Sequence, residues 1–145
     1  MSTVAAILKH KGYSVLTVHP DARVSDVTAI LSDNRIGAVL VIDEAEQMLG
    51  IVSERDIVRC LAANGPRTVE MTAGQLMTRT VQVAHPDMTV VEAMHVMTMG
   101  RFRHLPVVDR DTLVGLISIG DVVKARIMAQ DVAVESLTAY VAGSA

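Results

Sequence analysis

The sequence predicts an α/β fold of the α+β type: two β-α-β-β-α repeats packed sheet to sheet with pseudo-two-fold symmetry, plus flanking N- and C-terminal helices. Two internal repetitions carry this prediction. Residues 50–56 read Gly-Ile-Val-Ser-Glu-Arg-Asp and residues 115–121 read Gly-Leu-Ile-Ser-Ile-Gly-Asp, each between an apolar run and a helical pattern. The turn His-Pro-Asp also occurs twice, at 19–21 and 85–87. Each half is too small to bury a sheet alone, so we expect the halves to fold as one body.

The first repeat shows short apolar runs that alternate with segments of helical spacing. Runs of apolar and β-branched residues bounded by turn residues predict strands, whereas Val24, Val27 and Leu31 recur on one face of a helix. We therefore expect, in order, a strand over residues 15–18, a helix over 24–34, an antiparallel hairpin of 38–42 and 48–52, and a helix from Ser53 to about residue 64.

The second repeat has the same order of patterns and predicts a strand over residues 81–84, a helix over 89–99, a hairpin of 104–108 and 113–117, and a closing helix over 119–129. A short N-terminal helix, capped by Ser2 or Thr3, is expected outside the repeat, and a final helix over 131–141 is expected to pack on the body or on a partner. The expected segments are an N-terminal helix (1–14), a first repeat (15–65), a connection (66–79), a second repeat (80–129) and a C-terminal helix (130–145).

Composition and charge exclude several classes of protein. The longest apolar run, residues 36–42, is far shorter than the roughly 20 residues of a membrane span, and the N-terminus lacks a secretory pattern, so we expect a cytoplasmic protein without a membrane segment. A net charge of −3, with only two tyrosines and one phenylalanine for base stacking, argues against nucleic-acid binding. The single cysteine, Cys60, has no disulfide partner and is expected to pack as a small apolar side chain.

The element order, the two Gly-apolar-apolar-Ser-x-x-Asp segments and the Arg-His-Leu-Pro-Val-Val-Asp segment at residues 103–109 together resemble the cystathionine β-synthase (CBS) domain family. The chain is similar to a stand-alone CBS pair, or Bateman module, over residues 15–126. The resemblance implies a sensor that binds adenine-containing ligands, such as AMP, ADP, ATP, S-adenosylmethionine or NAD(H), in two clefts between the repeats. It also implies a homodimer.

Asp56 and Asp121 can be interpreted in two ways. A serine followed three residues later by an acidic residue at a helix start is typical of a capping box, in which each side chain satisfies a backbone N–H of the other residue. The family resemblance implies instead that each carboxylate accepts hydrogen bonds from the 2′- and 3′-hydroxyls of a ribose. Ser53 and Ser118 keep their capping role in either case, and the helix dipole there favours a nearby ligand phosphate.

Residues 101–104 (Arg-Phe-Arg-His) form the densest cluster of positive charge in the chain. One arginine there would be a solvated helix cap. Two arginines and a histidine exceed that need, and a guanidinium matches phosphate geometry, so we expect Arg101 or Arg103 with His104 to contact a ligand phosphate. The first repeat has only Arg35 at the corresponding place, so the two sites are expected to differ, and the second is expected to hold the more highly charged end of the ligand.

An adenine slot is implied by the family resemblance alone, because apolar strands form the core in any fold. We assign it to Val15, Val18, Thr80, Val83 and Pro106. The histidines at positions 19, 85 and 95 have no second ligand at metal spacing, so no metal site is expected.

The family resemblance implies a regulatory module that senses AMP, ADP, ATP or NAD(H) and reports to an unidentified target protein. The sequence contains no phosphate-binding loop, no dinucleotide-binding glycine motif and no constellation of a nucleophile with a base, so neither an enzyme nor a catalytic cofactor is expected. A ligand-free scaffold that only dimerises or binds other proteins stays open as an alternative, as does an S-adenosylmethionine sensor.

Overall fold

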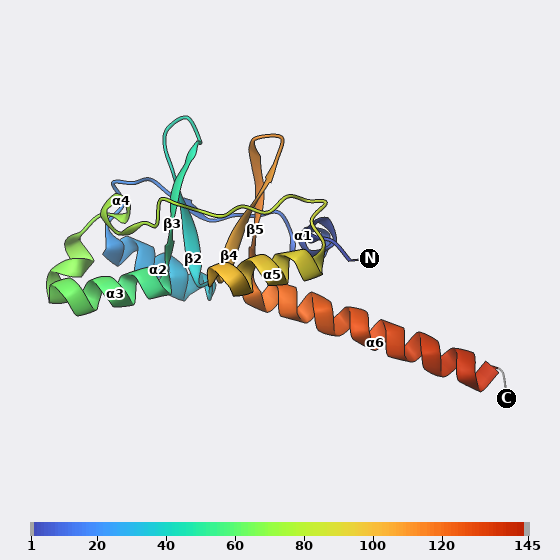
Figure 1. The fold of residues 1–145 in the computed structure, drawn as a ribbon. Helices are drawn as coiled ribbons and strands as arrows, with labels where there is room; N and C mark the ends of the chain where they lie inside the picture. Colours follow the sequence, from blue (N-terminus) through green and yellow to red (C-terminus); the bar gives the residue numbers. More distant parts are fainter. Residues whose placement is uncertain (1, 144–145) are drawn as a thin grey trace. The chain divides into compact units, whose positions relative to one another are not determined.

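A computed structural model describes residues 2–143 of the chain; residues 1, 144 and 145, at the outer ends of the two expected flanking helices, lie outside the described residues. The chain divides into two compact units, and Figure 1 labels most of their helices and strands. One unit spans Val15–Val81 without interruption, and we call it the continuous unit. The other joins the first fourteen residues to the chain from Gln82 onward, and we call it the composite unit.

The continuous unit contains the first repeat and the connection that follows it. Its elements in chain order are β1 (Thr17–Val18), α2 (Val24–Asn34), β2 (Ala38–Ile42), β3 (Met48–Ser53), α3 (Glu54–Asn64), the 3-10 helix η1 (Gly65–Glu70) and α4 (Ala73–Leu76). β2 lies at the centre of the sheet, parallel to β1 and antiparallel to β3, so that Val41 lies opposite Gly50. The buried core is aliphatic and extends from Val18 of β1 to Met77, which follows α4. The connection therefore packs as part of this unit.

The composite unit contains the second repeat and the N-terminal helix. Its elements in chain order are α1 (Val4–Lys11), α5 (Val90–Gly100), β4 (His104–Asp109), β5 (Thr112–Ser118) and α6 (Ile119–Gly143). β4 and β5 form an antiparallel hairpin in which Val107 lies opposite Gly115, and residues of α1, α5 and α6 share one core with it. Gly115 packs closely against α1, because an added Cβ would lie 2.6 Å from a methyl carbon of the buried Leu8 and would require that side chain to shift.

Helix α1 is the structural counterpart of α4. In the composite unit the backbone N–H of Val4, the first residue of α1, donates to the carbonyl of Met88 at 2.8 Å. In the continuous unit the N–H of Ala73, the first residue of α4, donates to the carbonyl of Ala22 at 2.7 Å. Both acceptors lie just before the first long helix of a repeat. The helix that precedes each repeat in sequence therefore packs on the other repeat, and α1 is not an addition outside the repeated pattern.

The strand expected over residues 81–84 is wrong, because among these residues only Ala84 pairs, in a single parallel bridge to β4. The cause lies in β4. In the continuous unit the N–H of Leu40 donates to the carbonyl of Leu16 and extends the contact between the parallel strands. The corresponding position in β4 is Pro106, which has no N–H, so the ladder cannot continue there.

The two helices expected over residues 119–129 and 131–141 form one continuous helix, α6 (Figure 1). Neither glycine nor proline occurs between Asp121 and Gly143, so no residue in this stretch ends the helix near residue 130. The expected break is therefore wrong.

The predicted fold class is confirmed: the protein is a mixed α/β structure with two small sheets, each covered by helices. Apart from residues 81–84 and the break in α6, the helices and strands of both repeats form where they are expected, although β1 is shortened to Thr17–Val18. The packing of one sheet against the other and the exact segment boundaries stay predictions.

Candidate functional site

Each hairpin ends in a serine that caps the following helix and holds an aspartate carboxylate at the strand end. At the start of α3, the Ser53 N–H donates to Oδ2 of Asp56 at 2.8 Å, and the Asp56 N–H donates to Oγ of Ser53 at 3.3 Å. The Ser53 hydroxyl donates to the same carboxylate oxygen at 2.9 Å. This reciprocal arrangement is a capping box, so the capping interpretation of the motif is confirmed at this position.

The start of α6 repeats the arrangement in the composite unit. The Ser118 N–H donates to Oδ2 of Asp121 at 2.8 Å, and the Asp121 N–H donates to Oγ of Ser118 at 3.2 Å. Both aspartates are half-buried and fixed in the first turn of a helix, where the dipole is positive. The repeated sequence motif thus becomes a pair of similarly fixed hydrogen-bond acceptors.

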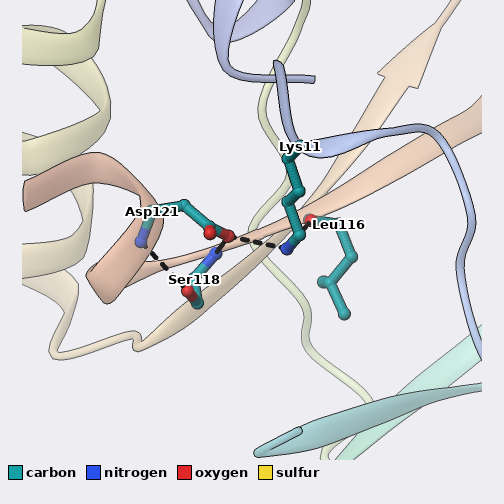
Figure 2. Close-up of polar contacts among 4 residues, drawn as sticks. All are labelled: Lys11, Leu116, Ser118 and Asp121. Atoms are coloured by element: carbon teal, nitrogen blue, oxygen red, sulfur yellow. Dashed lines mark hydrogen bonds and ion pairs between the residues drawn. The ribbon is translucent and has the colours of Figure 1, made fainter. Parts of the chain in front are cut away.

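The two carboxylates differ in the donor that reaches them from another part of the sequence. Oδ1 of Asp56 accepts a hydrogen bond from the Thr78 hydroxyl at 3.1 Å. Oδ2 of Asp121 instead lies 2.6 Å from Nζ of Lys11, which also donates to the backbone carbonyl of Leu116 at 2.8 Å (Figure 2). The contacts from Lys11 and from the Ser118 N–H both fall on Oδ2 of Asp121. Lys11 and the Ser118 N–H therefore share one carboxylate oxygen.

The surroundings of Asp121 change its acidity. Burial of the carboxyl group disfavours its charged form, but the hydrogen bond from Lys11 and those from Ser118 favour that form more strongly. The pKa of Asp121 therefore lies below its ordinary value of 3.8. The group is ionised at neutral pH and acts only as an acceptor.

The positive cluster that follows α5 lies at the same end of the composite unit as the α6 cap. Arg101 ends α5 in the left-handed conformation, with a φ of 58°, and the carbonyl of Arg103 accepts the N–H of Ile119 at 2.8 Å. His104 opens β4 directly opposite Ser118. The backbone therefore places this cluster beside the cap, with the side chains of both arginines exposed.

The continuous unit has the same backbone arrangement with fewer charges. Arg35 ends α2 in the left-handed conformation, with a φ of 53°, and the carbonyl of Gly37 accepts the N–H of Glu54 at 3.0 Å. Glycine thus stands where the second repeat has Arg103, and the expected difference in charge is present at matching positions. Arg35, Gly37 and Glu54 also line an open groove of about 660 Å³ between α2 and α3.

The five residues assigned to an adenine slot fall in both units. Val15, Val18 and Thr80 belong to the continuous unit, whereas Val83 and Pro106 belong to the composite unit. Val18 and Pro106 are buried in their strands, Val15 and Val83 are half-buried, and Thr80 is exposed. Their role in binding stays a prediction.

Sequence reasoning missed Lys11 and Thr78. Lys11 lies 110 positions before Asp121 in the chain, and no local pattern connects a lysine at a helix end with a distant cap. The only available signal was the alignment of α1 with α4, which becomes visible when each repeat is taken to begin at this helix and not at the strand that follows it.

Within residues 2–143, no group of three or more His, Cys, Asp or Glu is arranged to hold a metal ion, and no helix is long and apolar enough to cross a membrane.

Comparison with known families agrees with the structural repeat. The model of the CBS domain matches the chain twice, over residues 4–63 and 73–128. The two matches begin at the first residues of α1 and α4, the two helices that the backbone contacts identify as counterparts.

Individual proteins show the same similarity. The CBS domain-containing protein CBSX3, mitochondrial, of Arabidopsis thaliana is 31% identical over 98% of this chain and 73% of its own length. The crystal structure of the CBS-domain protein ATU1752 of Agrobacterium tumefaciens is 41% identical, with a TM-score of 0.84 over 86% of this chain and 99% of its own. The CBS domain pair of MJ0100, crystallised with 5′-methylthioadenosine and S-adenosylmethionine, is 26% identical, with a TM-score of 0.77 over 90% and 98% of the two chains. Because both family matches coincide with the structural repeats, the chain belongs to the CBS domain family and contains a tandem pair of CBS domains.

Proposed function

We propose that this CBS pair is a regulatory module that binds adenine nucleotides, namely AMP, ADP, ATP or NAD(H), at two related sites centred on Asp121 and Asp56. The observation that supports the proposal best is the repeated cap, which fixes one half-buried carboxylate at a helix start in each unit. A carboxylate held by backbone N–H groups loses little further freedom when it accepts the two vicinal hydroxyls of a ribose. The repeated motif thus suits a nucleoside at each site.

The cations beside the α6 cap suit a phosphate group. The guanidinium groups of Arg101 and Arg103 are exposed, and each can donate two parallel hydrogen bonds to phosphate oxygens. His104 and the Ser118 hydroxyl add polar groups, and the positive end of the helix dipole favours an anion. Ser53 takes the corresponding place in the first site, which has fewer cations. The apolar side chains of Val15, Val18, Val83 and Pro106, together with Thr80, complete the proposal as the slot for the adenine ring.

The ligand complex of MJ0100 supports the chemical class of ligand, since that CBS pair was crystallised with two adenosine compounds. Neither compound carries a phosphate. The cations at residues 101–104 therefore favour a nucleotide for this chain, and S-adenosylmethionine is the alternative within the same class.

The proposed activity is binding, with no catalytic step assigned to the chain. The module would act on a target protein, as a homodimer in the cytoplasm. The name of the Arabidopsis relative places that protein in mitochondria, so fluorescence microscopy of the tagged protein in its own cells tests the location directly.

Calorimetric titration of the Asp121→Ala variant with AMP, ATP and NADH tests the site. Loss of one or two charge-assisted hydrogen bonds, worth about 1.5–3 kcal/mol each, is expected to weaken binding at least about tenfold. Asp109→Ala is the matched control, because it removes an exposed acid from the same unit. Unchanged affinity in folded Asp121→Ala would contradict the assignment.

A second candidate function is a ligand-free interaction scaffold. It is favoured by the exposed apolar side chains of Val123, Ile127 and Met128 on α6. Thermal melts with AMP, ATP, NADH and S-adenosylmethionine separate the two candidates, since a ligand that binds only the folded state raises the midpoint. A midpoint that none of these compounds moves would favour the scaffold, whereas a shift with one compound identifies the ligand.

A further inference from the structure

Lys11 lies at the centre of the Asp121 site although it belongs to the other end of the sequence. It is the last residue of α1, and its ammonium lies between Oδ2 of Asp121 and the carbonyl of Leu116, at 2.6 and 2.8 Å (Figure 2). The described residues thus use two of its three N–H donors. The side chain is 38% exposed, so a molecule bound to the carboxylate can also reach the ammonium.

In the continuous unit, Thr78 donates hydrogen bonds to the acceptors that correspond to Asp121 and Leu116. Its side chain carries no charge. Its N–H donates to the carbonyl of Ile51 at 2.8 Å, and its hydroxyl donates to Asp56 at 3.1 Å. Ile51 and Leu116 each follow the glycine of the repeated motif, so their carbonyls correspond. One ammonium therefore replaces two neutral donors of a threonine.

This replacement changes the net charge that a ligand meets. Lys11 forms an ion pair with Asp121, whereas the donors that the described residues supply to Asp56 are all neutral. A negative carboxylate repels a phosphate that lies several ångströms away on the same ligand, which is within the Debye length of about 8 Å at physiological salt. The ion pair removes this repulsion from the Asp121 site only.

We propose that Lys11 is a specificity-determining residue of the Asp121 site, where its ammonium selects phosphorylated adenine ligands over uncharged nucleosides. This inference rests on the proposed function, because it requires Asp121 to bind the ribose. Lys11 occupies Oδ2 and leaves Oδ1 for a ribose hydroxyl, so it weakens the binding of the nucleoside portion. A negatively charged ligand recovers the lost affinity through attraction to the ammonium, whereas an uncharged nucleoside does not.

Calorimetric titration with AMP and with adenosine tests the inference on the wild type and on Lys11→Met. The ratio of AMP affinity to adenosine affinity is expected to fall about tenfold in Lys11→Met, through weaker AMP binding and unchanged or tighter adenosine binding. Lys11→Arg is expected to retain the ratio. Lys9→Met, which removes the same charge from an exposed position on the same helix, is expected to leave it unchanged.

The outcomes separate the inference from the proposed function. If the ratio in Lys11→Met stays within about twofold of the wild type while Asp121→Ala still weakens AMP binding, the inference is overturned and the proposed function stands. If the wild type binds none of adenosine, AMP, ADP, ATP and NADH, both are overturned. Circular dichroism establishes that each variant is folded, and Lys11→Gln replaces Lys11→Met for the same titrations if the methionine variant does not fold.

Discussion

Helices α3 and α6 begin with the same capping arrangement, but the capping carboxylates accept hydrogen bonds from different donors. The carboxylate of Asp56 receives a neutral hydroxyl from Thr78, whereas that of Asp121 receives the ammonium of Lys11. Lys11 ends α1, and Thr78 follows α4, so both donors come from the helical segments that precede the repeats in sequence. The repeated motif thus determines where each carboxylate lies, and residues outside the motif determine its electrostatic surroundings.

The glycines that begin the two motifs also differ in the atoms that lie next to them. A Cβ added to Gly50 would lie 2.6 Å from the backbone oxygen of Thr78, whereas one added to Gly115 would lie 2.6 Å from a terminal carbon of Leu8. A leucine side chain can change its rotamer, but a backbone oxygen moves only with the chain. The same glycine is therefore more restricted in the continuous unit.

The largest effect is expected from Leu8→Ala, because Leu8 is only 1% exposed and fills the space above Gly115. The cavity should destabilise the composite unit by about 2–5 kcal/mol. Amide hydrogen exchange should show faster opening of β4 and β5 and little change in β2 and β3. Val58→Ala, at a position of α3 that is 63% exposed, is the control. Equal loss of protection in both hairpins would contradict the assignment of α1 to the composite unit.

A smaller effect is expected from the two glycines. Gly50→Ala should destabilise its unit by about 2–3 kcal/mol and Gly115→Ala by about 1 kcal/mol, in the range measured for overpacked cores. Denaturant unfolding of both variants gives the comparison. Adding Leu8→Ala should remove the cost of Gly115→Ala, because the two residues share one space. A larger cost at Gly115 than at Gly50 would show that the backbone near Thr78 yields more easily than Leu8 does.

The smallest effect is expected from Lys11→Met, which should cost about 0.5–1 kcal/mol at neutral pH, as for other partly exposed ion pairs. The lowered pKa of Asp121 gives a stabilisation that is present above the ordinary value of 3.8 and is lost as the pH falls through the folded value. Unfolding measured between about pH 6 and 2 should therefore show a shallower acid loss in Lys11→Met than in the wild type. A parallel pH profile would contradict the role of Lys11 at Asp121, and Lys9→Met serves as the control.

The sequence predicted those features that depend on short-range patterns. The hairpins, the caps at Ser53 and Ser118 and the helices that follow could be placed because turn residues, periodicity and capping chemistry act within a few residues. The strand over residues 81–84 failed because its partner, Pro106, lies in a distant segment and removes the needed donor. Lys11 was missed for the same reason. Its partner, Asp121, is distant in sequence, because α1 packs on the second repeat and α4 packs on the first.

The packing of α1 on the second repeat has a consequence for the order in which the protein can fold during synthesis. The continuous unit is complete once the chain has been made through Val81, so it can fold while the remainder is still being translated. Helix α1, although made before the continuous unit, can pack only after Gly115 and Asp121 have been made, and an isolated helix of 8 residues is only marginally stable in water. Helix α1 is thus made before the continuous unit but packs after it, and the Asp121 site forms only when Lys11 meets the segment at residues 115–121.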